Sequence, residues 1–309
     1  MPALRFLPCH AEATRCPARI DASVRVAVLA ALLLTAACGR GGPLRVDPNA
    51  FSWNAPMAAP GELHLRNMNG TIDVEPATGG NVSVTAEIRW HTGDPKQDIK
   101  FVTVPSGNDF TVCAVWGRGT CTDQSYNASG NNFLRSLLRG RPSDATVRLI
   151  VHVPTGVRVD AFSMNGSVSV LATAPVRARA INGGIKVGTS VGPVEAETVN
   201  GNVDARMTTL SGDGPVKVMT VNGTASAYVP ITFGGAVRVS TMNGRAGSDF
   251  AVTTSGEASP RNGVEGTVGK GAGSIEVKSM NGNAWLRKLN ADGTVAGVTA
   301  STPGSAEKP

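Results

Sequence analysis

Apolar and polar residues alternate with a period of two along most of the chain. Val176 and Ala178, for example, flank the charged Arg177 and lead into an Asn-Gly pair. A strand with one buried face and one face in water has this pattern. Outside the repeats described next, strands are expected at 82–90, 99–104, 110–116 and 146–153.

A short phrase, an apolar residue followed by Asn-Gly, punctuates these strands. Asn and Gly adopt positive φ more readily than other residues, so each pair predicts a tight turn. The spacing is roughly twenty residues, which indicates a repeat architecture. The phrase occurs at Met68-Asn69-Gly70, Met164-Asn165-Gly166, Ile181-Asn182-Gly183, Val199-Asn200-Gly201, Val221-Asn222-Gly223, Met242-Asn243-Gly244 and Met280-Asn281-Gly282. The last gap becomes two ordinary steps if Asn262-Gly263 is counted.

Each repeat holds two short strands, and one repeat alone buries too few small aliphatic side chains to offset its ordering entropy. Neighbouring repeats must therefore stack. They can form either a β-solenoid with one coil per repeat or an up-and-down meander with Asn-Gly at alternate hairpins. A polar residue two places before most of the Asn residues favours the solenoid, because such residues can form hydrogen-bonded ladders between coils. These residues are Asn67, Ser163, Thr198, Thr220, Thr241 and Ser279.

The fold class expected is all-β, with the solenoid at 58–289 and an insertion at 91–145. The insertion carries Phe133, Leu134, Leu137 and Leu138 at helical spacing. It is interpreted either as a lid over an exposed sheet edge or as a binding loop. Residues 38–57 are expected to form a tether, and residues 290–309 a disordered tail.

The first 37 residues resemble a secretory signal, with an apolar run at 26–37 that is too short to span a membrane. The run ends in Leu34-Thr35-Ala36-Ala37-Cys38-Gly39, which resembles the lipobox of bacterial lipoproteins with Cys38 as the lipidated residue. Thr35 stands where that motif usually has Leu. The alternative is an ordinary signal peptide and plain secretion. Either one predicts an exported protein, and the lipobox adds a membrane anchor in the periplasm or at the cell surface.

Two cysteines remain beyond the leader, Cys113 and Cys121. An even pair in an exported chain predicts a disulfide. A metal site is the rival interpretation, but it needs further ligands, and His91 and His152 are not expected to supply them.

Charge and composition exclude some functions. The net charge is +6 and aromatic residues make up 5% of the chain, without a basic cluster that is interleaved with aromatics. Nucleic-acid binding is therefore not expected.

Motifs for zinc, phosphate or a serine nucleophile are absent from the sequence, so no cofactor or metal is expected and the protein is predicted not to be an enzyme. A glycan-cleaving β-helix is the enzymatic alternative, since paired carboxylates occur at Asp73/Glu75 and at Glu195/Glu197. Both pairs alternate with apolar residues, as solvated strand faces do.

Taken together, the repeats, the phrase Val112-Cys113-Ala114-Val115-Trp116 with Cys121, and the closing Gly273–Gly282 segment resemble the DUF4097 "putative adhesin" family of bacterial envelope proteins. The resemblance covers roughly residues 60–289. It implies a right-handed β-solenoid, export and an adhesin-like role, and it supplies no catalytic residues. The expected partner is an envelope protein, a glycan or a lipid. An envelope-stress module that binds lipid or antimicrobial peptides is the alternative function.

Overall fold

The computed structural model describes residues 42–127, 143–189, 192–210, 214–254, 262–290 and 292–295. The chain divides into two compact units, Met1–Gly42 and Pro43–Pro309. Nearly all of the first unit lies outside the described residues, including the predicted signal peptide and Cys38. None of the helices in the described residues is long and apolar enough to cross a membrane.

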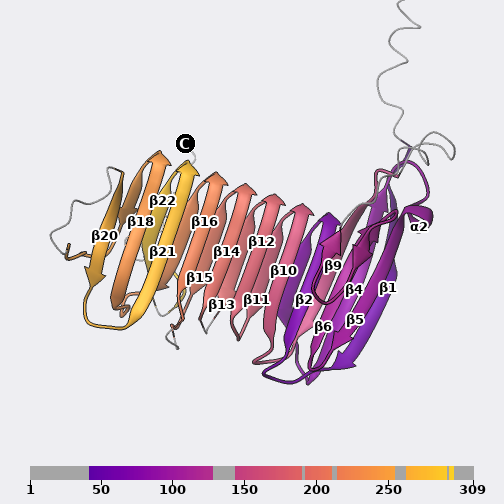
Figure 1. Cartoon of the computed structure of the whole chain (residues 1–309), viewed down its shortest axis with the longest axis horizontal. Coiled ribbons are helices and arrows are strands. Elements are labelled where there is room, and N and C mark those ends of the chain that lie inside the picture. Colours follow the sequence, from indigo (N-terminus) through magenta and orange to yellow (C-terminus); the bar gives the residue numbers. More distant parts are fainter. Residues whose placement is uncertain are drawn as a thin grey trace, which may run out of the picture. The chain divides into compact units, whose positions relative to one another are not determined.

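The second unit is all-β, as predicted (Figure 1). Its strands are β1 (Arg45–Pro56), β2 (Glu62–Asn69), β3 (Ile72–Pro76), β4 (Asn81–Trp90), β5 (Ile99–Ser106), β6 (Asp109–Trp116), β7 (Thr120–Cys121), β8 (Tyr126–Asn127), β9 (Thr146–Val153), β10 (Arg158–Asn165), β11 (Val168–Ala172), β12 (Val176–Asn182), β13 (Ile185–Thr189), β14 (Val194–Asn200), β15 (Val203–Met207), β16 (Val216–Asn222), β17 (Ala225–Pro230), β18 (Gly235–Asn243), β19 (Ala246–Ser248), β20 (Gly263–Val268), β21 (Gly273–Asn281) and β22 (Ala284–Leu289). One short helix, α2 (Pro95–Asp98), precedes β5.

The strands form two ten-stranded sheets and a small β7–β8 ribbon. The first sheet, called sheet A, has the order β1-β4-β9-β3-β11-β13-β15-β17-β22-β19. The second, called sheet B, has the order β20-β18-β21-β16-β14-β12-β10-β2-β6-β5. Alternate residues of both sheets are buried and make one apolar core, which includes Leu63, Val159 and Leu286.

Successive repeats are coils: each runs along sheet B, turns at Asn-Gly and continues in sheet A. The coil strands pair in parallel, with Val159 opposite Val176 and Val176 opposite Val194. A meander would pair neighbouring strands antiparallel, so that alternative is wrong for these coils. Antiparallel pairs occur toward the ends of the stack, at β1–β4, β4–β9, β5–β6 and β18–β20.

The Asn-Gly corners differ from the predicted tight turns. Among the described residues positive φ occurs at glycines alone, for example Gly201 at 159° and Gly223 at 149°. The Asn residues instead hydrogen-bond from coil to coil: the Nδ2 of Asn200 donates to the Oδ1 of Asn182 at 2.7 Å. Glycine is needed because adjacent corners touch. A Cβ on Gly223 would collide with the carbonyl oxygen of Gly201 in the preceding coil.

The polar residues two places before each Asn do link the coils, although they bond to the backbone rather than to each other. The hydroxyls of Thr198 and Thr220 donate to the carbonyls of Gly183 and Gly201, both at 2.8 Å. Ser163, Thr241 and Ser279 make the same bond to the corner glycines Gly70, Gly282 and Gly223. On β12 this position is Ala180, which has no hydroxyl.

One coil is stacked out of sequence order. The coil β21–β22 lies between β16–β17 and β18–β19, so Asn281 is opposite Asn222 on one side and Asn243 on the other. Asn262 and Gly263 do not form a coil corner. They lie at the start of β20, which pairs antiparallel with the outer side of β18.

Three predicted boundaries need correction. Residues 45–56 form β1 rather than a tether, because Phe51 stacks on Phe101 and Trp53 packs against Phe110. The 91–145 segment is not wholly an insertion, since its strands β5 and β6 extend sheet B. Its apolar residues at helical spacing lie outside the described residues. In the predicted tail, the amide of Asn290 donates to the carbonyl of Thr294 at 2.8 Å, so the described part of that segment forms a turn.

Candidate functional site

The outward face of sheet B carries side chains in rows that cross the coils. One row alternates in charge from strand to strand, and we call it the charged row. The strand registers place Asp160, Arg177, Glu195, Lys217, Glu276, Arg238 and Glu265 along it, and His64 lies at the end of the row next to Asp160. Opposite charges on adjacent strands attract, so this row supports the stacking order.

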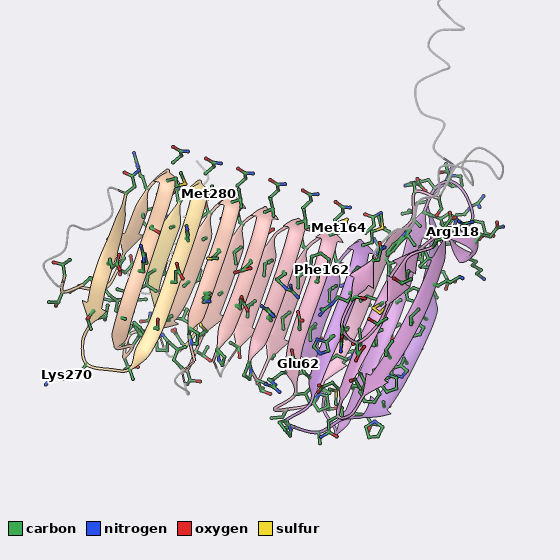
Figure 2. The ribbon with its side chains drawn as sticks, viewed as in Figure 1. Glu62, Arg118, Phe162, Met164, Lys270 and Met280 are labelled. Atoms are coloured by element: carbon green, nitrogen blue, oxygen red, sulfur yellow. A yellow bond between two sulfur atoms is a disulfide. The ribbon has the colours of Figure 1, made fainter. Side chains whose placement is uncertain are left out.

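A second row, beside the Asn corners, is entirely apolar. This apolar row contains Met68, Met164, Ile181, Val199, Val221, Met280 and Met242, and Figure 2 shows Met164 and Met280 near the corner ends of their strands. The exposed fractions of Val199, Met280 and Met242 are 40%, 39% and 60%. Their side chains point away from the core, because the residue directly before each of them, a Ser or Thr except for Asn67 and Ala180, is buried and points inward.

The apolar row borders a shallow hollow of about 350 Å³. Its walls are the apolar side chains of Phe162, Val199, Met219, Val221 and Met280. Charged groups at its rim are Arg179, Glu197 and Lys278. An apolar surface with a few polar groups at its edge is suited to binding, since it buries apolar area and orients the ligand.

The predicted disulfide is present and holds a loop over one end of this face. Cys113 on β6 is bonded to Cys121 on β7. Tyr126, on β8, donates its hydroxyl to the carbonyl of Ala114 at 2.7 Å and packs edge-on against Phe162. Burial raises the pKa of the Tyr126 hydroxyl, and the positive charge of Arg66 lowers it in part. Through Tyr126, the loop therefore covers the sheet B face next to Phe162.

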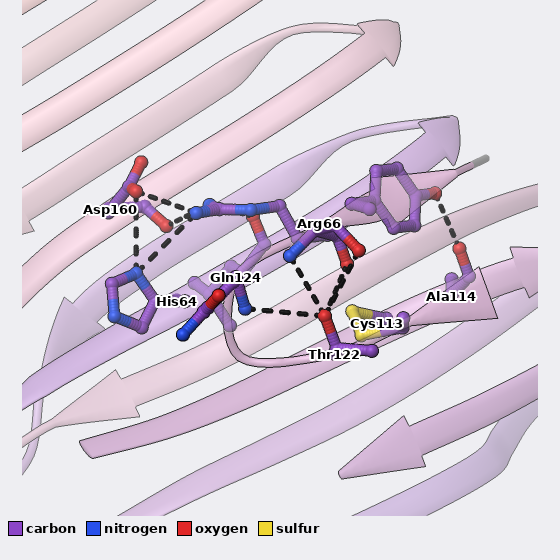
Figure 3. The surroundings of a disulfide bond; sticks show 11 residues. His64, Arg66, Cys113, Ala114, Thr122, Gln124 and Asp160 are labelled. Carbon is purple, nitrogen blue, oxygen red and sulfur yellow. Dashed lines mark hydrogen bonds and ion pairs between the residues drawn. A yellow bond between two sulfur atoms is a disulfide. The ribbon is translucent and has the colours of Figure 1, made fainter. Parts of the chain in front are cut away.

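Near this disulfide-held loop lies a buried carboxylate, that of Asp160 (Figure 3). Arg66 donates to its Oδ2 at 2.6 Å, Arg179 lies 3.2 Å from its Oδ1, and His64 Nδ1 lies 3.3 Å from its Oδ2 (Figure 3). Burial raises the pKa of Asp160, but the hydrogen bond from His64 and the charges of Arg66 and Arg179 outweigh burial and hold the pKa well below its usual range.

Glu62, His64 and Asp160 lie close enough to be considered as metal ligands. Asp160 already pairs with two guanidinium groups, which would repel a cation. The arrangement is better explained as an ion-pair network that joins β2, β10 and β12. Cys113, in its disulfide, is not available as a metal ligand either.

One carboxylate of each pair considered for catalysis is engaged in an ion pair. Asp73 accepts from Arg148 at 2.7 Å, and Glu195 lies 2.8 Å from Arg177. Both carboxylates lie on partly exposed strand faces rather than in an enclosed cleft. The sequence analysis did not identify the apolar row or the Asp160 network. The apolar row had a signal, since each member directly precedes an Asn-Gly pair and follows the inward position.

Comparison with known proteins gives no family. No family model matches the sequence, and no curated protein matches it. Among solved structures, a putative cell adhesion protein from Clostridium sporogenes ATCC 15579 is similar with a TM-score of 0.41 and 14% identity, over 78% of this chain and 100% of the other. A putative adhesin from Bacteroides fragilis NCTC 9343 is similar with a TM-score of 0.29 and 10% identity, over 79% of this chain and 97% of the other. These values are too low to assign a function.

Proposed function

We propose that this chain is an exported, non-enzymatic binding protein of the bacterial cell envelope, with an adhesin-like role. The observation that carries the proposal is the apolar row with its adjoining hollow on sheet B. Several of its side chains are exposed where a strand face turned to water is normally polar. A contiguous exposed apolar surface with a charged rim is typical of an interaction site.

Two further parts of the proposal come from the sequence. The lipobox-like segment ending at Cys38 supports a lipid anchor, which would hold the coils at a membrane surface. Right-handed winding of the coils is supported by the strong preference for right-handed connections between parallel strands. Incorporation of labelled palmitate into the chain, and its loss in Cys38→Ser, would test the anchor.

The binding surface is tested by charge substitution in the apolar row. Val199→Asp and Met280→Asp place a carboxylate beside the hollow, and Leu171→Asp on β11 of sheet A is the matched control, because Leu171 is also exposed, at 51%. We expect each apolar-row variant to weaken retention of protein-coated beads on immobilised envelope extract about tenfold, the effect of losing about 1.4 kcal/mol.

A second readout uses the dye anilinonaphthalene sulfonate, which fluoresces on exposed apolar surface. The two apolar-row variants should lower the dye signal of the folded protein, and Leu171→Asp should retain more of it. Equal loss of bead retention in all three variants, or in none, would contradict the proposed surface.

A second candidate function, binding of lipid or antimicrobial peptides in envelope stress, draws on the same apolar row. It predicts that the wild type, but not Met280→Asp, binds vesicles that contain phosphatidylglycerol. Retention on envelope extract without vesicle binding would favour the adhesin-like role. Turnover of any envelope polysaccharide that is lost in Glu195→Gln would instead show an enzyme.

A further inference from the structure

The out-of-order coil β21–β22 occupies a slot whose two walls come earlier in the chain. One wall is β16–β17 and the other is β18–β19. The strands β18, β19 and β20 therefore come before β21–β22 in the sequence. In the structure, β21–β22 lies between them and the rest of the stack. Along the chain, the slot is complete before its occupant begins.

Hydrogen bonds from both walls hold the occupant. On the β16–β17 side, Ala225 N donates to Asn283 O at 2.9 Å, and the Ser279 hydroxyl donates to Gly223 O at 2.9 Å. On the opposite side, Ala284 N donates to Arg245 O at 2.9 Å. The Asn281 amide completes the corner ladder on both sides, at 2.9 Å to Asn222 and 2.8 Å to Asn243.

The buried and charged positions fit equally well. Ile275, Val277 and Leu286 are fully buried between the sheets. Outside, Glu276 lies between Lys217 and Arg238, so its carboxylate has a basic residue on each neighbouring strand. A coil that fits this slot therefore needs buried apolar residues at alternate positions, a glycine at the corner and an acidic residue at the position of Glu276.

A connector of only four residues, 269–272, joins the occupant to β20. It crosses the start of β18, where a Cβ on Gly234 would meet the carbonyl of Lys270 and a Cβ on Gly271 would meet the carbonyl of Gly234. Crossing β18 requires about 10 Å, two strand spacings, while the steps from Val268 to Gly273 span at most about 17 Å. The connector therefore reaches the coil's own slot with about 7 Å to spare, and removal of two residues would leave three steps, about 10 Å, which is just the distance required.

We propose that this slot is an interaction site for the β21–β22 coil of a second copy of the chain, which yields a coil-exchanged dimer. The foreign coil has the same sequence, so it makes every hydrogen bond and apolar contact described above. Exchange of an identical element is a known low-barrier route to dimers, and repeat proteins are prone to it. The connector and the entrance to the slot lie at the same ends of the sheet B strands, so two copies with these ends apposed can exchange coils.

The test uses the full chain with Cys9, Cys16 and Cys38 replaced by Ser. Lys217 and Glu276 are register partners on adjacent parallel strands, a spacing that a disulfide can bridge. Lys217→Cys is placed in one copy and Glu276→Cys in a second copy with a size tag, and both are produced together under oxidising conditions. The double variant in one chain, Lys217→Cys with Glu276→Cys, reports correct pairing within a monomer.

We expect a cross-linked dimer of the untagged and the tagged copy. Its amount should be several-fold above that formed when the Glu276→Cys copy also carries Gly282→Val, whose side chain would collide with Gly223. Deleting Lys270 and Gly271 should raise the dimer share, because the shortened connector barely reaches its own slot. The proposal is overturned if the double variant cross-links within one chain while the mixed copies give no dimer. It is also overturned if the shortened connector leaves the dimer share unchanged. Neither result bears on the apolar row.

Discussion

The hydroxyl that is missing from β12 allows a direct test of what joins the coils. In the neighbouring coils, Ser163 and Thr198 donate to a corner glycine carbonyl of the preceding coil. Ala180 occupies the same position opposite both of them in register, and it is buried. In the part of the chain that the structure describes, no side-chain hydroxyl bonds to the carbonyl of Gly166. We therefore expect Ala180→Ser to stabilise the protein.

The magnitude follows from the hydrogen bond that is added. A new bond from a hydroxyl to a buried carbonyl contributes about 0.5–1.5 kcal/mol. The opposite change, Thr198→Val, keeps the shape of the side chain but leaves the Gly183 carbonyl without its 2.8 Å donor. That substitution should cost about 1–3 kcal/mol, because the cost of an unpaired buried acceptor exceeds the net gain from a formed bond.

Equilibrium unfolding in guanidinium chloride measures both effects as shifts of the midpoint with an unchanged slope. Ser169→Ala on β11 is a suitable control, since Ser169 lies on the partly exposed side of its strand. The reasoning is refuted if Ala180→Ser lowers the free energy of unfolding while Thr198→Val leaves it unchanged. Such a result would mean that strand pairing alone sets the stacking energy.

Other substitutions address the remaining contacts. Asp160→Asn should destabilise the protein by about 3 kcal/mol, because it leaves the largely buried guanidinium of Arg66, which is 14% exposed, without its counter-charge. Since the folded-state pKa of Asp160 is lowered, its contribution is present above the unfolded pKa of about 3.9 and is lost as the pH falls toward the lower folded value; wild type and variant should therefore converge in acid unfolding curves. Replacing Cys113 and Cys121 by Ser should cost about 2–3 kcal/mol, read as a lower melting temperature that matches the reduced wild type. Gly223→Ala should cost about 2 kcal/mol or more, through its φ of 149° and the collision with the neighbouring corner; a melting temperature equal to wild type would disprove that close approach.

The sequence by itself determined the local elements of the fold, namely its strands and the corners between them. Period-two alternation placed the strands, the Asn-Gly phrases placed the corners, and the inward Ser and Thr residues indicated bonds between coils. The disulfide between Cys113 and Cys121 was predicted because two cysteines remain beyond the leader. All of these signals depend on residues that are close together in the chain or on the number of cysteines.

Tertiary structure decided the order of the coils and the nature of the surface. The phrases that end in Gly244 and Gly282 are nearly identical, so no local signal distinguishes which coil stacks on β16–β17. Pairing of β20 with β18, together with the short connector, decides it. Likewise Asp160 occupies an outward strand position, and contacts from Arg66, far away in sequence, make it a buried charge. The coil order and the burial of Asp160 depend on contacts between residues far apart in the sequence, and such contacts produce no periodic pattern of apolar and polar residues.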